Sequence, residues 1–313
     1  MSEFPFFSII IPTYNRAAFI EATLRSVLEQ TYRRYEIIVI DNCSTDNTEE
    51  LLQPFVRAGQ IKFIKHEENY ERARSRNTGL EAASGDFVTF LDSDDFMYPN
   101  NLADAAEYAL SHPESKCFQS LYELVDAQRN VIYRYKFPSL KNQTKAIAHG
   151  NFMSCIGDFI HREIYTQYRF DTRPEVTGSE DWDFWLRVLA DYQVGRIEKI
   201  NNGIRHHEGR SVNNQDLVSL QRGLEQVIAK ISQDQHLASV YRRYLKHIEA
   251  TSLVYVAILA NSGFRYHEAL RYLYRAVAKD THIVTSPRFI KALQIALFRL
   301  NSSGFKTRKI EVK

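Results

Sequence analysis

The first ninety residues alternate between two apolar patterns, and this alternation constrains the fold more than any other feature of the sequence. Four short runs are almost entirely apolar and rich in β-branched residues, which is typical of buried strands: 7–11, 36–40, 61–64 and 87–91. The segments between them carry apolar residues at helical spacing. Apolar strands that alternate with helices predict an α/β fold, with a parallel sheet covered by helices on both faces.

One of the intervening helices has a recognisable start. Asp46 and Glu49 are three residues apart, as in a capping box, and Leu51, Leu52 and Phe55 follow as an apolar face. Helices are also predicted over 16–30 and 72–83.

Polar side chains gather where three of the predicted strands end, at 13–16, 41–44 and 92–95. Ligands of parallel sheets bind beyond the carboxyl ends of the strands, so these clusters predict a binding site. The last cluster contains Asp92, Asp94 and Asp95. Hard divalent cations prefer such oxygen ligands, although an isolated acidic turn that caps the next element would look the same.

Composition and charge divide the chain into two parts. With 44% hydrophobic and 25% charged residues, it is an ordinary globular sequence. Residues 1–212 hold 24 Lys and Arg against 31 Asp and Glu, whereas residues 213–313 hold 16 against 7. The second part is almost entirely helical in pattern, so we predict an α/β domain over 1–212 and a basic helical region over 213–313.

The sequence also favours a cytoplasmic setting. Cys43, Cys117 and Cys155 are widely spaced and form no metal or disulfide pattern, as expected of reduced thiols. No signal peptide is apparent, and the longest apolar stretch, 253–260, is far shorter than the ~20 residues of a membrane span.

Several motifs then occur in a fixed order: 7–16, 38–46, 76–79, 91–95, 180–187, and Arg205-His-His207 followed by Ser211. Together they resemble the family 2 glycosyltransferases with the GT-A fold, whose Rossmann-like sheet is mostly parallel. The resemblance covers about residues 5–212. It implies inverting transfer of a sugar from a nucleotide diphosphate, usually UDP, to a hydroxyl of a glycan or glycolipid acceptor in polysaccharide synthesis. No nucleic-acid partner is expected.

The resemblance also implies a role for each motif residue. Asp41 would accept hydrogen bonds from the nucleobase, Asp92 would bind the ribose, and Asp94 would ligate Mn²⁺ or Mg²⁺. Arg205 and His207 would contact the diphosphate, and His207 would complete the metal shell. The nucleotide-binding set as a whole is Pro12, Thr13, Tyr14, Asn15, Arg16, Asp41, Asn42, Arg76, Asp92 and Ser93. Two residues have alternatives: Asp41 could cap its own turn, and Asp95 is expected to cap the segment from Phe96.

The arginines at 72, 74 and 76 point in different directions if they lie on a helix, so they cannot all face one diphosphate. Arg76 matches the family pattern and is the candidate for the diphosphate, whereas Arg72 and Arg74 could equally be solvated. Glu71 and Ser75 replace the Gly and Ala that are common in the family, so the donor contacts of this loop stay open.

Asp181 is the candidate general base, because sugar transfer to a hydroxyl requires a carboxylate that removes the proton. Asp183 is a competitor two residues away, and Glu180 is expected to orient the loop. These acids could also simply form the start of a helix.

Other classes fit less well. A dinucleotide oxidoreductase would carry a GxGxxG motif after the first strand, where this chain has Pro12-Thr-Tyr-Asn15. A glycoside hydrolase uses two carboxylates but needs no nucleobase site. The alternative that stays open is a catalytically inactive module that binds nucleotide sugars.

The C-terminal region leaves two interpretations open. An apolar side of a helix near Pro287 is formed by Phe289, Ile290, Leu293, Leu297 and Leu300, whereas Ile295 and Phe298 lie on the other side. The basic residues are Arg288, Lys291, Arg299, Lys306, Arg308 and Lys309. This pattern predicts either peripheral contact with an anionic membrane, such as the inner face of the plasma membrane, or a helix packed on two sides.

Overall fold

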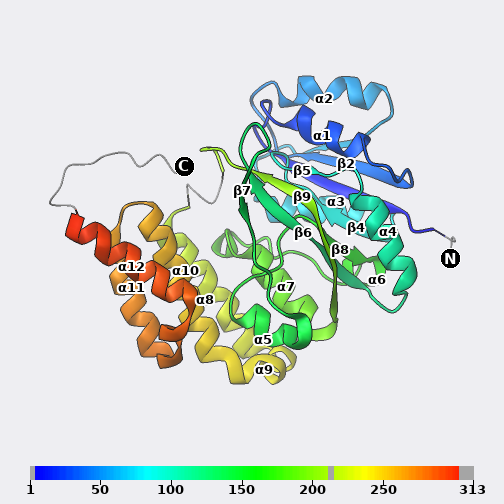
Figure 1. The fold of residues 1–313 in the computed structure, drawn as a ribbon. Helices are drawn as coiled ribbons and strands as arrows, with labels where there is room; N and C mark the ends of the chain where they lie inside the picture. The colour runs from blue at the N-terminus through cyan, green and yellow to red at the C-terminus, as the bar shows by residue number, and fades with distance from the viewer. Residues whose placement is uncertain (1–3, 211–214, 303–313) are drawn as a thin grey trace. The chain divides into compact units, whose positions relative to one another are not determined.

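The computed structural model describes residues 4–210 and 215–302. The chain divides into two compact units, the first formed by residues up to 147 together with 151–208 (Figure 1). The second contains residues 148–150 and the chain from 209 onward. The boundary expected near residue 213 lies outside the described residues, and so does Ser211, so the division at 212 stays a prediction.

The first ninety residues form the strands and helices expected of them. Four strands lie side by side in parallel, in the order β3-β2-β1-β4. Their bounds are β1 Phe7–Thr13, β2 Tyr35–Asp41, β3 Lys62–Lys65 and β4 Phe87–Phe90. The helices between them are α1 Ile20–Leu28, α2 Thr48–Arg57 and α3 Arg72–Ala82. The prediction for this part of the fold is confirmed.

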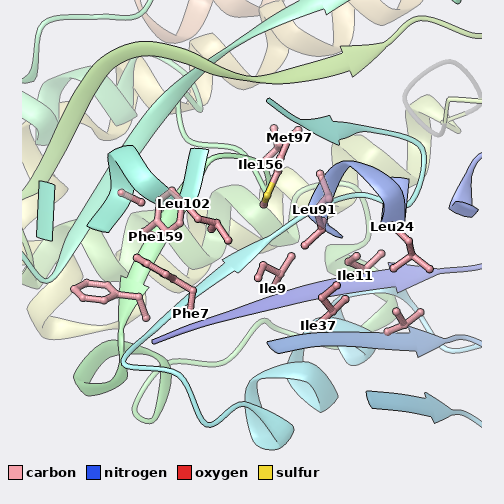
Figure 2. Packing of buried hydrophobic residues seen from close by; sticks show 14 of the residues in the cluster. Phe7, Ile9, Ile11, Leu24, Ile37, Leu91, Met97, Leu102, Ile156 and Phe159 are labelled. Carbon is pink, nitrogen blue, oxygen red and sulfur yellow. The ribbon is translucent and has the colours of Figure 1, made fainter. Parts of the chain in front are cut away.

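Side chains of β1 alternate between the two faces of the sheet. Ile9 and Ile11 lie in one apolar cluster with Leu24 of α1 (Figure 2). On the opposite face, Gly79 of α3 packs so tightly that a Cβ there would lie 2.3 Å from Cγ2 of Ile10. Helices therefore cover both faces of the parallel strands, as the apolar strand pattern predicts.

The other half of the sheet is mixed rather than mostly parallel. Within the described residues the strand order continues from β4 as β8-β6-β9-β5, with β7 paired to β6. These strands are β5 Phe96–Met97, β6 Cys117–Val125, β7 Val131–Arg134, β8 Asp158–His161 and β9 Val194–Arg205. Among the pairings described in this half, β6 with β9 is parallel and the others are antiparallel.

The predicted capping box does not form. Helix α2 begins at Thr48, whose backbone N–H donates to Oδ1 of Asp46 at 3.0 Å. Glu49 pairs instead with Lys65 of β3, at 2.5 Å between Oε2 and Nζ. Asp46 thus caps the helix start without a reciprocal bond from Glu49.

The rest of the first unit supplies short helices around the sheet: α4 Asn101–Ser111, α5 Gln143–Ala148, α6 Arg162–Tyr165 and α7 Glu180–Asp191. The second unit is helical throughout its described part. Its helices are α8 Leu217–Gln233, α9 Gln235–Tyr241, α10 Leu245–Ser262, α11 Tyr266–Lys279 and α12 Pro287–Ser302. No helix in the described ranges is long and apolar enough to cross a membrane.

Candidate functional site

The predicted polar clusters meet at one edge of the sheet. Thr13 ends β1 directly beside Asp41 at the end of β2. Leu91, just after β4, donates its backbone N–H to the carbonyl of Ile10 at 3.0 Å. The loops that follow these three strands therefore lie side by side, as the strand-end rule predicts.

The loops after β1 and β2 are joined by side-chain hydrogen bonds. The backbone N–H of Asn15 donates to Oγ of Ser44 at 2.9 Å, and its Oδ1 accepts from the N–H of Thr45 at 2.8 Å. Asn15 and Cys43 both have left-handed backbone conformations, with φ of +50° and +65°. Such conformations are uncommon for residues other than Gly and concentrate where a loop is built for a function.

Asp41 is completely buried at the base of this loop pair. Its carboxylate accepts hydrogen bonds from the N–H of Ser44, at 3.1 Å, and from the Ser44 hydroxyl. These are the turn-capping contacts that the sequence analysis gave as the alternative. A contact between Asp41 and a nucleobase stays a proposal.

Asn42 connects the loop after β2 to the loop after β3. Its Nδ2 donates to Oδ1 of Asn69 at 2.8 Å, and its Oδ1 accepts from the N–H of Tyr70 at 3.0 Å. Nδ1 of His66 also lies 3.0 Å from Oδ1 of Asn42. Neither His66 nor Tyr70 belongs to a sequence motif, so no pattern predicted their place in the site.

The aromatic and basic side chains near these loops are partly open to solvent. Tyr14 and Tyr70 are 39% and 38% exposed. Arg74 is exposed, and its guanidinium lies 5.2 Å from the centre of the Tyr70 ring. Tyr14, Tyr70 and Arg74 therefore lie beyond the strand ends with much of each side chain exposed to solvent.

The acidic loop after β4 brings together residues from three distant parts of the sequence. Oδ2 of Asp94 lies 3.1 Å from Nε of Arg16 and 3.1 Å from Nε2 of His207. The His207 ring stacks on Phe19, with ring centres 4.5 Å apart. His206 is exposed, so His207 is the histidine that reaches the acidic loop.

Arg205 has contacts that differ from the expected diphosphate role. Its Nη1 donates to the backbone carbonyls of Asp94 and Asp95, at 2.9 and 3.0 Å, and to the hydroxyl of Thr23. Its backbone N–H donates to the Asp95 carboxylate at 2.9 Å. Arg205 therefore braces the acidic loop from β9, and the Asp95 carboxylate joins that loop to β9.

A buried ion-pair network connects the acidic loop to helix α7. Arg76 is only 3% exposed, and its two Nη atoms lie 3.3 Å from Asp92 and 3.2 Å from Glu180. Nε of Arg72, one helical turn earlier, lies 3.4 Å from the same Glu180 oxygen. Of the two alternatives for Arg72, the structure therefore shows a paired side chain rather than a simply solvated one. Its spacing of four residues from Arg76 was the signal that could have found this contact.

Glu180 also fixes the start of α7, since its Oε2 accepts from the N–H of Gly178 at 2.8 Å. Burial raises the pKa of Glu180, but the guanidinium groups of Arg72 and Arg76 outweigh burial and hold that pKa below its ordinary value. The residue is therefore a permanent anion that orients the loop, in agreement with the expectation from its position.

The two aspartates of α7 have different surroundings. Asp183 is 1% exposed, and its carboxylate pairs with Arg187 at 2.8 Å. The Asp183 carboxylate is therefore buried and already paired. Asp181 is partly exposed, and its Oδ1 accepts from the N–H of Trp182 at 2.7 Å. Burial and the charge of Glu180 raise the pKa of Asp181 to about 6, against the opposing effect of Arg76. Of the two, Asp181 is the carboxylate that a substrate can reach.

The described residues contain no group of three or more His, Cys, Asp or Glu side chains arranged to hold a metal ion. Mg²⁺ and Mn²⁺ are commonly held by one or two carboxylates together with substrate phosphates. Asp94 with the adjacent His207 fits that smaller set, provided that Arg16 gives up its bond to Asp94.

The comparisons with known proteins agree with this geometry. The model of glycosyl transferase family 2 matches residues 8–171, slightly more than half of the chain. The chain belongs to this family. It is therefore a glycosyltransferase, and the expectation of an enzyme is confirmed.

Two relatives indicate the kind of biosynthesis. TuaG of Bacillus subtilis (strain 168), whose name places it in teichuronic acid biosynthesis, is 31% identical over 187 residues, which cover 59% of this chain and 72% of TuaG. The Escherichia coli UDP-Glc:alpha-D-GlcNAc-diphosphoundecaprenol beta-1,3-glucosyltransferase WfgD is 30% identical over 190 residues, which cover 61% of this chain and 72% of WfgD. The chain is thus related to enzymes of cell-surface polysaccharide synthesis.

A solved structure shares the fold over nearly the whole length. Residues 1–349 of TarS from Staphylococcus aureus, in complex with UDP-GlcNAc, match with a TM-score of 0.65 at 18% identity, over 98% of this chain and 95% of that one. The mannosyltransferase PcManGT from Pyrobaculum calidifontis, in complex with GDP-Man and Mn²⁺, matches with a TM-score of 0.61 at 16% identity, over 96% of this chain and 86% of that one. At these identities the likeness shows the fold alone, and the predicted GT-A fold is confirmed.

Proposed function

We propose that this glycosyltransferase moves a sugar from a UDP-linked donor to a hydroxyl of a glycan or lipid-linked acceptor, with inversion, in cell-surface polysaccharide synthesis. One observation carries the proposal: ion pairs centred on the buried Arg76 and Glu180 connect the strand-end acidic loop to the helix of the candidate base. Asp92 bonds to Arg76, Arg76 bonds to Glu180, and Asp181 follows Glu180 in the chain. An inactive binding module would have no use for an accessible carboxylate with a raised pKa at that position.

Each end of the network has its own chemical task. Asp181 accepts the proton of the attacking hydroxyl, as a general base does in a single displacement. Asp94 and His207 would hold Mn²⁺ or Mg²⁺, which when bound stabilises the negative charge that develops on the leaving diphosphate. Arg16 lies beside Asp94 and is positioned to contact the phosphates once the Asp94 carboxylate is engaged elsewhere.

UDP is proposed as the donor nucleotide because Asp41 and the loops around it favour a base with an N–H beside carbonyl groups. WfgD and the TarS complex carry UDP-sugars in their names, whereas the PcManGT complex carries GDP-Man. The comparison of UDP with GDP is therefore the discriminating one for this chain.

A thermal-shift panel tests both donor and metal. UDP-glucose, UDP-N-acetylglucosamine and GDP-mannose are each added with Mn²⁺ or with EDTA. A donor at ~100 times its dissociation constant adds ~2.7 kcal/mol of stability. We expect stabilisation by a UDP-sugar, only with Mn²⁺, and its loss in Asp94→Ala. Glu107→Ala, which removes an exposed acid from α4, is the control and should respond as the unchanged protein does.

Tighter binding of GDP-mannose than of either UDP-sugar would overturn the donor class. Equal stabilisation in EDTA would overturn the metal requirement.

We further propose that the second unit contacts the inner face of the cytoplasmic membrane peripherally. Phe289, Ala292 and Ala296 of α12 are buried, whereas Ile290, Leu297 and Phe298 are 43%, 46% and 70% exposed. On the apolar side expected from the sequence, Phe289 is thus buried while Ile290 and Leu297 are exposed, and Phe298 is exposed on the other side. The side chain of Leu300 and residues Lys306, Arg308 and Lys309 lie outside the described residues. Exposed apolar side chains on a unit rich in Lys and Arg are what an anionic membrane surface attracts.

A further inference from the structure

The loop that precedes β8 reaches the candidate base through Asn151. Nδ2 of Asn151 donates to Oδ2 of Asp181 at 3.1 Å, while the backbone N–H of Trp182 donates to Oδ1. Each oxygen of the carboxylate therefore has a neutral donor. Asn151 belongs to none of the motifs in the sequence.

The other end of the Asn151 amide shows why it points this way. Its Oδ1 is buried and has no hydrogen-bond partner among the described residues. A buried carbonyl without a partner costs free energy, and native structures rarely leave one without a reason. Rotating the amide by half a turn would bring this carbonyl against the Asp181 carboxylate, which is electrostatically worse. The observed orientation therefore gives the Asp181 carboxylate a hydrogen-bond donor and leaves Oδ1 of Asn151 without a partner among the described residues.

A neutral N–H donor on an ionised carboxylate has two consequences. It stabilises the charged form, and it restricts rotation of the carboxylate so that its free lone pairs keep one direction. Both matter at Asp181, because partial burial and the adjacent Glu180 work against ionisation. A general base must be ionised and aimed at the hydroxyl before it can accept the proton.

We propose that Asn151 is a positioning residue, which holds the Asp181 carboxylate ionised and oriented for the acceptor hydroxyl. The inference rests on the proposed function only in taking Asp181 as the base. Asn151 exchanges no proton itself and acts through the Asp181 carboxylate to which it donates. A purely structural asparagine would stabilise the loop around residues 151–157 without influencing the titration of Asp181.

Titration of Asp181 in the full-length protein separates the two roles. The protein is labelled with ¹³C-aspartate, and the carboxyl signal of Asp181 is identified by its loss in Asp181→Asn. We expect the pKa of Asp181 in Asn151→Ala to rise by about one pH unit, the amount that loss of a hydrogen bond to a charged group implies. Asn142→Ala is the control, since its Oδ1 accepts only from the backbone of Lys145 in the described contacts. An unchanged Asp181 titration in folded Asn151→Ala would overturn the proposal.

Asn151→Asp provides a second variant of nearly the same shape, which keeps the test valid if the alanine variant does not fold. Two carboxylates at this distance share a proton and titrate as a pair, so the upper pKa should rise well above that of the unchanged protein. Two independent titrations near the unchanged value would contradict the contact.

The acid limb of the pH–rate profile for UDP release should move upward by the same amount as the titration. If Asp181→Asn keeps full activity, the proposed base is wrong, and the titration still decides whether Asn151 controls this carboxylate.

Discussion

The raised pKa of Asp181 predicts that the rate of sugar transfer depends on pH. Its pKa of about 6 lies well above the ordinary value of 3.8, first because of burial and then because of Glu180. Because this pKa is raised in the folded protein, protonation of Asp181 adds to the free energy of unfolding. That contribution is complete below the ordinary pKa of 3.8 and is lost as the pH rises through about 6. General-base catalysis requires the ionised form of Asp181 instead, because only that form accepts a proton.

We therefore predict that the rate of UDP release falls as the pH drops below about 6. Glu180→Gln removes the adjacent negative charge, so this variant should move the acid limb to lower pH. A pH–rate profile from 4.5 to 9 on both proteins measures this. A profile with no acid limb in this range, or a limb that Glu180→Gln moves upward, would contradict the role of Asp181.

Sequence patterns predicted individual site residues unevenly. The motifs contained Asp94, His207 and Asp181, which follow strand ends or open a helix, and Arg76, which lies within α3. For Arg205 they predicted a diphosphate contact, and the structure adds that its guanidinium braces the acidic loop. Asn151 had no signal at all, since its place beside Asp181 depends on an irregular loop 30 residues away in sequence.

Among the elements, α3 depends most strongly on a single small residue. Gly79 faces β1 and β2, and a Cβ there would lie 2.3 Å from Ile10 and 3.1 Å from Ile40. Both isoleucines are completely buried, so neither side chain has room to move. The close packing of α3 also sets the position of Arg76, one turn earlier.

Gly79→Ala should accordingly destabilise the protein by ~1–3 kcal/mol, the usual cost of overpacking a core, despite the better helix propensity of Ala. Thermal or urea unfolding measures the change. Glu81→Ala, an exposed position on the same helix, is the matched control and should stay within ~0.5 kcal/mol. A neutral or stabilising Gly79→Ala would show that α3 does not pack on the sheet this closely.

The elements that sequence predicted well are those with strong local periodicity. Strands β1, β2 and β4 are short apolar runs, and amphipathic helices α1 and α2 follow β1 and β2. The capping box failed because Glu49 found a better partner in Lys65, which is distant in sequence and adjacent in space. The middle of the chain gave no such local pattern, because β6, β8 and β9 are defined by pairing over long separations.

For the chain as a whole, the main open point is where it finds its acceptor. A lipid-linked acceptor would require the enzyme to work at a membrane, although no described helix could span one. The exposed apolar residues of α12 are the ones that we propose for such contact.

We predict that Leu297→Ser combined with Phe298→Ser weakens binding to vesicles that contain phosphatidylglycerol by about tenfold or more, because each buried apolar side chain contributes ~1.5–3 kcal/mol. Binding should also fall with salt and with the fraction of anionic lipid. Val131→Ser combined with Ile132→Ser, which removes two apolar side chains of 45% exposure from β7, is the control. Equal binding by both double variants, or binding that ignores anionic lipid, would remove the membrane role of α12.

The central claim is that Asp181 is the base of a UDP-sugar transferase, and UDP release tests it most directly. UDP is measured with Mn²⁺ and the UDP-sugar that stabilises the protein, in the unchanged protein, Asp181→Asn and Asp183→Asn. We predict that Asp181→Asn still binds the donor but turns over ~10²–10⁴-fold more slowly, as loss of a general base implies. Asp183→Asn should lose stability through its broken pair with Arg187 while retaining the chemistry. Normal turnover by Asp181→Asn, with loss of turnover in a folded Asp183→Asn, would contradict the account.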